Sequence, residues 1–87
     1  MSDAYERLDE LATLLTRRFS DITPRRLKGA RILYLLSAGQ GTRNVIWNQS
    51  AAEYAWYGDP GHGTLLGTTA EQAAEEIGRT LGLSTAP

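Results

Sequence analysis

The stretch ILYLLSAGQGTRNVIWNQSAAEYAWY, residues 32–57, decides the fold, because it breaks into short apolar runs whose side chains fit a period of two, with Tyr54 and Trp56 on one face. Alternation of this kind is typical of β-strands. We expect strands at Ile32–Leu36, Asn44–Asn48 and Glu53–Tyr57, and a short closing strand at Thr64–Gly67. Turn-forming residues separate these runs, so the sequence predicts an antiparallel meander of three or four strands.

One amphipathic helix is predicted on each side of this strand region, because apolar residues recur there at three- and four-residue steps. The second helix carries a capping box, either Thr68-x-x-Glu71 or Thr69-x-x-Gln72, and Gly82 is placed to end it. Gly78 lies inside this helix and suggests a close backbone contact. The two apolar stripes are Tyr5, Leu8, Leu11, Ala12, Leu15 and Phe19, and then Ala70, Ala73, Ala74, Ile77 and Leu81.

The predicted fold is therefore α+β, with the order αβββ(β)α and both helices packed on one face of the sheet. We expect residues 1–87 to form a single small domain, since 87 residues leave room for one modest core. Two helices can cover only one face of so small a sheet. The other face must be polar, or it must dimerise.

Residues 24–38 allow two interpretations. Thr23 and Pro24 form a good helix start, and such a helix would end at Gly39. Gly29 in its interior, and apolar residues on nearly every side of 32–36, count against it. The sequence therefore favours a turn or one short helical turn over residues 24–28, followed by a strand that is buried on both faces.

Composition excludes several classes of protein. The chain has no cysteine and one histidine, so a disulfide scaffold, a cysteine-based zinc site and a histidine pair within one chain are all impossible. Its longest apolar run, 32–36, is far shorter than the roughly 20 residues of a membrane span. No signal-peptide pattern opens the sequence, and we expect a cytoplasmic protein without metal or cofactor. Eight of the nine bases are arginine, a bias typical of GC-rich genomes such as those of actinobacteria and their phages.

Charge is unevenly distributed along the chain. Ten acids and nine bases give a net charge of −1, yet six of the bases lie within residues 17–31. A near-neutral total argues against a dedicated nucleic-acid binder, although a local basic cluster is compatible with an anionic partner. The first two of these bases also have a simpler explanation as helix C-terminal residues. The candidate phosphate-contacting residues are Arg17, Arg18, Arg25, Arg26, Lys28 and Arg31.

One local motif follows the first predicted strand. Residues 36–43, LSAGQGTR, resemble the L-A-A-G-x-G-T-R signature of sugar-phosphate nucleotidyltransferases, whose glycine-rich loop approaches nucleotide phosphates. Ser37 replaces the usual alanine, and the chain continues into Val45 and Trp47 where that family continues into a helix. The family's doubly wound sheet also needs more than twice this length. We therefore interpret residues 38–42 as a glycine-containing hairpin loop.

Aromatic residues form the second candidate site. Trp47, Tyr54, Trp56 and Tyr57 lie in the predicted sheet, with Tyr57 on the face opposite Tyr54 and Trp56. On an uncovered face they would form a platform for a partner protein or for bases. The interpretation we favour places most of these rings in the core, because the chain has only seven aromatic residues.

Catalytic machinery is not visible in the sequence. The paired carboxylates at 9–10 and 75–76 lie on the polar sides of the helices, and no serine lies in a nucleophile elbow. We therefore expect a non-enzymatic interaction module that contacts another protein or a second copy of itself, through its second sheet face or its alanine-lined helix. The alternative is a nucleic-acid-associated factor that uses the basic segment 17–31.

Overall fold

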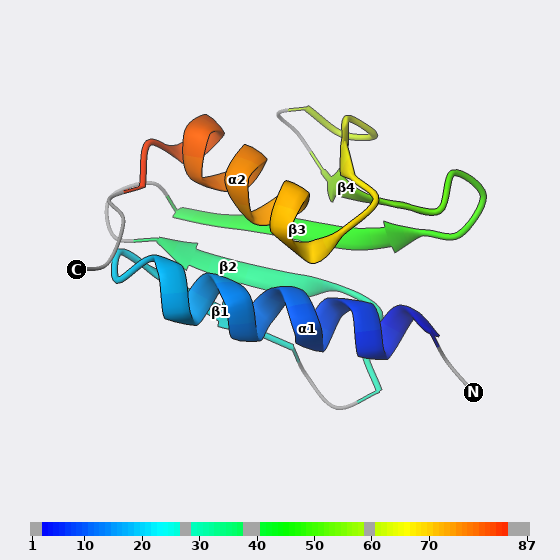
Figure 1. Cartoon of the computed structure of the whole chain (residues 1–87), viewed down its shortest axis with the longest axis horizontal. Coiled ribbons are helices and arrows are strands. Elements are labelled where there is room, and N and C mark those ends of the chain that lie inside the picture. Colours follow the sequence, from blue (N-terminus) through cyan, green and yellow to red (C-terminus); the bar gives the residue numbers. More distant parts are fainter. Residues whose placement is uncertain (1–2, 27–28, 38–40, 59–60, 84–87) are drawn as a thin grey trace.

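The computed structural model describes residues 3–26, 29–37, 41–58 and 61–83. Two helices bracket a five-stranded antiparallel sheet whose strands are neighbours in sequence order (Figure 1). The α+β class and the predicted order of helix, meander and helix are confirmed. The elements are α1 (Asp3–Arg18), β1 (Ile22–Arg25), β2 (Leu33–Ser37), β3 (Gly41–Asn48), β4 (Glu53–Tyr57), β5 (Leu65–Gly67) and α2 (Ala70–Leu81).

Strand β1 is the element that the sequence did not predict. A turn was expected from residue 24 onward, but Pro24 and Arg25 are extended and pair with Leu35 and Tyr34 of β2. Proline is tolerated here because β1 is an edge strand, so its missing N–H can face away from the ladder. The alternative helix over 24–38 is wrong, since residues 33–37 form β2.

Register divides the sheet into two unlike faces. Residues that are paired across antiparallel strands share a face, so Leu33, Val45 and Trp56 lie in one row on one side. All three are buried. Both helices lie over this covered face, side by side (Figure 1). The covered face is thus the floor of the core, and the opposite face has no helix on it.

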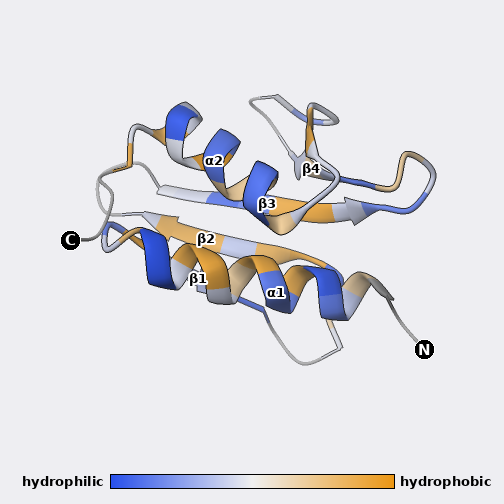
Figure 2. Cartoon of the chain, in the orientation of Figure 1, coloured by the Kyte–Doolittle hydropathy of each residue, from blue (hydrophilic) through white to orange (hydrophobic). Residues whose placement is uncertain are grey.

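The helices pack as their stripes predict. Leu8, Leu11 and Leu15 of α1 are fully buried, and Phe19 directly after the helix is 5% exposed. In Figure 2 hydrophobic and hydrophilic residues follow one another along each helix. Strand β2 and the middle of β3 are the most hydrophobic strand segments. The alanine stripe of α2 is buried in the same core. A surface for dimerisation through that stripe is therefore ruled out, because its side chains already pack inside the domain.

The ends of α2 confirm the predicted caps. Thr69 is the N-cap, and its Oγ1 accepts a hydrogen bond from the N–H of Gln72 at 3.1 Å. The Gln72 Oε1 accepts from the N–H of Thr68 at 3.0 Å, one residue before the cap, so the reciprocal bond of a capping box is not made to Thr69. Gly82 is left-handed with φ 65°, and Leu83 N–H then donates to the Gly78 carbonyl at 2.9 Å. This is the hydrogen bond of a Schellman ending.

Gly78 makes the close contact that its place in the helix suggested. A Cβ built at this residue would lie 2.5 Å from Cζ and 2.9 Å from Cε1 of the Phe19 ring. Phe19 directly follows α1, so the missing side chain of Gly78 allows the C-terminal part of α2 to pack against the ring at the end of α1. Glycine has a lower helix propensity than alanine, but at this position it permits the close contact.

Candidate functional site

The predicted aromatic site divides between the two faces of the sheet. Tyr54 is fully buried and Trp56 is 3% exposed, and both belong to the core cluster under the helices. Trp47 is half-buried on the same covered face. The interpretation of these rings as core residues is confirmed, and an exposed platform that includes Tyr54 and Trp56 is wrong. Tyr57 alone points to the uncovered face, where it is 44% exposed.

Tyr54 fastens helix α1 to the sheet. Its hydroxyl donates to the backbone carbonyl of Arg7 at 2.6 Å, and its ring meets Trp47 edge-on at 5.0 Å between centroids. The Arg7 guanidinium stacks over the Trp47 ring at 4.6 Å. Burial raises the pKa of the Tyr54 phenol to about 12; the carboxylate of Glu10 adds to this rise, and the guanidinium of Arg7 opposes it.

The raised pKa of Tyr54 predicts a loss of stability in alkali. Between pH 10 and 12 a tyrosine in the unfolded chain, with a pKa near 10, gives up its proton while folded Tyr54 keeps its own. The unfolded state then binds fewer protons, so the free energy of unfolding falls as pH rises through this window. Urea unfolding at pH 8–12 should show a shallower fall in Tyr54→Phe. That variant starts about 1 kcal/mol less stable, for want of the hydrogen bond. Parallel curves for the two proteins would contradict the assignment.

The bases of segment 17–31 do not lie together in the structure. Arg17 and Arg18 end α1, whereas Arg26, directly after β1, contacts Asp9 and Tyr5 in the N-terminal half of that helix. From Asp9, which contacts Arg26, to Arg17 is about 12 Å along the helix axis. Lys28 lies outside the described residues. The six bases are thus not one patch.

Arg26 is already engaged within the domain. Its Nε and Nη2 donate to the two carboxylate oxygens of Asp9 at 2.6 and 2.8 Å, and its guanidinium lies 5.1 Å from the centre of the Tyr5 ring. The hydrogen bond from Arg26 lowers the pKa of the Asp9 carboxyl. Arg31 also lies over Tyr5, at 5.9 Å from its centre. These arginines attach the β1–β2 connection to α1, which is a structural role.

The uncovered face of the sheet carries an exposed apolar patch. Leu36, Tyr57 and Leu65 are 40%, 44% and 44% exposed, and they are the exposed large hydrophobic residues of the described chain. Pairing places all three on this face, from three different strands. The apolar members of the face are Tyr34, Leu36, Ile46, Ala55, Tyr57 and Leu65. Exposed apolar patches of this kind commonly mark interaction sites.

The sequence pattern did not predict most of this surface. Residues Ile32–Leu36 were predicted to be buried on both faces of the strand. In the structure Leu33 and Leu35 are buried, whereas Leu36 is exposed. The signal was present in the alternation itself, since Leu36 and Ile46 occupy the positions between the core residues of their strands. The alternation did not say which of the two faces the helices cover.

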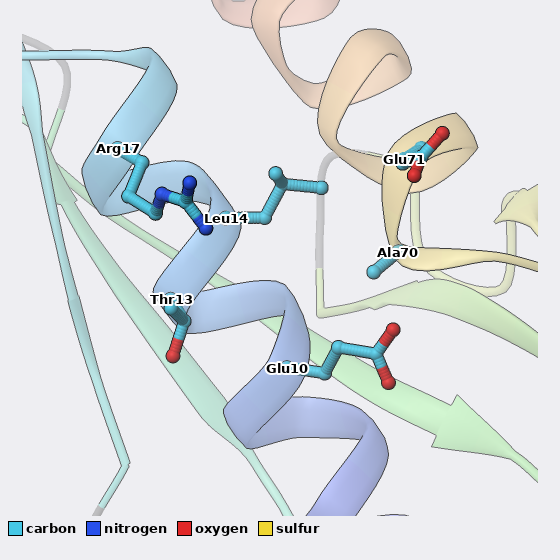
Figure 3. A pocket seen from close by; sticks show the side chains of 6 residues that line it. All are labelled: Glu10, Thr13, Leu14, Arg17, Ala70 and Glu71. Atoms are coloured by element: carbon cyan, nitrogen blue, oxygen red, sulfur yellow. The ribbon is translucent and has the colours of Figure 1, made fainter.

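A groove between the helices is one of the hollows that ionisable groups line. It has a volume of about 370 Å³ and is lined by Glu10, Thr13, Leu14, Arg17, Ala70 and Glu71. Figure 3 shows Glu10 and Leu14 extending from α1 toward the start of α2, where Ala70 faces them. Both carboxylates are exposed to solvent, and the Thr13 hydroxyl donates to the Asp9 carbonyl at 3.0 Å. The lining thus offers solvated charges and an engaged hydroxyl, with no nucleophile held by a base.

The remaining polar motifs serve the fold. Gly41 pairs with Ser37 across the β2–β3 hairpin, so the glycine motif joins two strands as predicted. The predicted loop over residues 38–42 is too long, because Gly41 and Thr42 belong to β3; residues 38–40 lie outside the described chain. Arg43 of that motif stacks on Trp56 at 4.3 Å. His62 Nδ1 accepts from Gly58 N–H at 2.7 Å in the β4–β5 turn. Within the described ranges no three acidic or histidine side chains come together as a metal site.

Comparison with known proteins gives no match to a family model, a curated protein or a solved structure. None of the helices described is of a length and apolarity that would cross a membrane.

Proposed function

We propose that this chain is a non-enzymatic interaction module that acts through protein–protein contacts made by the uncovered face of its sheet. The observation that carries the proposal is the placing of Leu36, Tyr57 and Leu65, each at least 40% exposed, on the one face that no helix covers. Burying such side chains against a partner is favourable by about 25 cal/mol for each Å² of apolar area.

The edges of the sheet support contact through the face. Edge strands are the usual alternative, since their free N–H and C=O groups can pair with another chain. Here β1 carries Pro24, which lacks an N–H, and β5 has only three residues, Leu65–Gly67. Both are features that discourage edge pairing. A partner that binds this domain therefore gains more binding free energy from contact with the sheet face than from pairing with either edge strand.

The nucleic-acid alternative has less to support it. Phosphate binding needs several bases that can contact one backbone at the same time. Arg17 and Arg18 lie at the C-terminal end of α1, and Arg26 lies beside its N-terminal half, where it is paired with Asp9. The basic segment thus offers two small sites with α1 between them.

Site-specific photo-crosslinking tests the proposal. A benzoylphenylalanine at Tyr57 reports on the uncovered face, and the same probe at exposed Thr80 of α2 is the matched control. We expect a discrete protein adduct from the Tyr57 probe in cells that express the chain, with the cross-linked peptide mapped by mass spectrometry. That adduct should disappear when Leu65→Lys is added. Equal adducts from both probes, no adduct from Tyr57, or an adduct insensitive to Leu65→Lys would contradict the proposal.

A further inference from the structure

We infer that the occupant of the uncovered face is a second copy of this chain, packed sheet to sheet about a twofold axis. The inference rests on the proposed function, because it names the partner of the same surface. Its independent support is the pair of charges on that face: the strand residues there include one base, Arg25, and one acid, Glu53. The rest are apolar or neutral.

Arg25 and Glu53 lie at diagonally opposite corners. Arg25 pairs with Tyr34, which pairs with Asn44, which pairs with Tyr57, so one row crosses the face from β1 to β4. Glu53 is four residues before Tyr57 on β4. Three strand spacings across and four residues along give a diagonal of about 20 Å.

The two charges are available for a partner. Arg25 is exposed and Glu53 is half-buried, and neither forms an ion pair with another residue in the described part of the chain. A separation of about 20 Å is too long for them to pair with each other. Each corner therefore presents a charge that the other corner of an identical face would complement.

A twofold axis in the interface plane, at right angles to this diagonal, brings the complementary corners together. It exchanges the two corners, so Arg25 of each copy faces Glu53 of the other, in two equivalent pairs. The midpoint of the diagonal falls between β2 and β3 in the row of Ile46 and Ala55. Ile46 and Tyr57 thus lie close to the axis, whereas Leu36 and Leu65 lie about as far from it as the two charges do.

The area of the face sets the strength of the contact. Five strands at about 4.8 Å and a length of about 20 Å give on the order of 400–500 Å² for each copy. A stable interface commonly buries about 800 Å² on each partner. We therefore expect a weak, reversible dimer, which calls for measurement between about 10 µM and 1 mM, where contacts of this size associate.

Sedimentation equilibrium over this range tests the inference on the full chain. The wild-type chain should shift from monomer toward dimer, and Arg25→Glu or Glu53→Arg alone should weaken association at least tenfold, because like charges then meet at both corners. Arg17→Glu and Glu75→Arg, which change the net charge equally at exposed helical positions, are the matched controls and should leave it unchanged.

Mixing the two charge variants is the decisive arm. A heterodimer of Arg25→Glu with Glu53→Arg has an acid facing a base at both corners, so a one-to-one mixture should recover association near the wild-type strength. Circular dichroism on each variant confirms that it is folded. A wild-type chain that stays monomeric to 1 mM, equal weakening by the controls, or a mixture no stronger than its components would overturn the inference. A monomeric chain whose Tyr57 probe still captures a different protein would leave the proposed function standing.

Discussion

Tyr54→Ala is expected to lower the free energy of unfolding by about 3–5 kcal/mol, whereas Tyr57→Ala should lower it by less than about 1 kcal/mol. The two tyrosines lie three residues apart on β4, on opposite faces of the sheet. Tyr54 is fully buried, its ring meets Trp47 and its hydroxyl holds α1. Removing it leaves a cavity and ends the attachment to Arg7. Tyr57 is 44% exposed and has little packing to lose.

Urea denaturation followed by tryptophan fluorescence and by far-ultraviolet circular dichroism measures both effects. If Tyr54→Ala is too unstable to study, Tyr54→Leu keeps part of the volume and should still cost more than Tyr57→Ala. Equal losses from the two alanine variants would mean that the sheet does not have one covered and one uncovered face.

Gly78→Ala is expected to destabilise the protein by about 1–3 kcal/mol, although alanine is the better helix former by about 1 kcal/mol. The new methyl group would overlap the ring of Phe19, which is 5% exposed. Thr80→Ala, at an exposed position of the same helix, is the matched control. It carries the gain in helix propensity without the overlap, so it should leave stability unchanged or slightly higher.

A double-mutant cycle separates this packing effect from helix propensity. Phe19→Leu replaces the ring that the new methyl group would meet with a shorter side chain. Gly78→Ala should therefore lower the free energy of unfolding less in the Phe19→Leu background than in the wild type. Chemical denaturation midpoints of the four proteins give the coupling. A stabilising Gly78→Ala, or the same cost in both backgrounds, would contradict the contact between α2 and Phe19.

Sequence periodicity predicted the parts of the fold whose apolar pattern is strong. Both helices, and the strands at β2, β3, β4 and β5, were predicted within a few residues of their bounds. Strand β1 was not predicted, because proline is rare in strands and this four-residue edge strand contains Pro24. Ile22 is its one buried residue, so β1 carries almost no apolar alternation. Its pairing with β2 is a tertiary contact that local pattern does not encode.

The candidate surface was less predictable, because it depends on where the helices lie. Alternation separates Tyr54 from Tyr57, and it does not say which of the two the helices cover. The basic segment shows the same limit: Arg18 and Arg26 are close in sequence, yet Arg18 ends α1 while Arg26 contacts Asp9 in the first half of that helix. The exposed Leu36 and Leu65 became visible as one surface only through strand pairing.

The uncovered sheet face is the proposed contact surface, and isotope-filtered NMR tests that claim most directly. A one-to-one mixture of labelled and unlabelled chain at about 1 mM populates a weak dimer. We expect intermolecular NOEs from the methyl groups of Ile46 and Leu65 to aromatic protons of the unlabelled copy, and none from Leu14, which is half-buried on α1. Intermolecular NOEs confined to Leu14, or none from Ile46 and Leu65 while the chain sediments as a dimer, would contradict it.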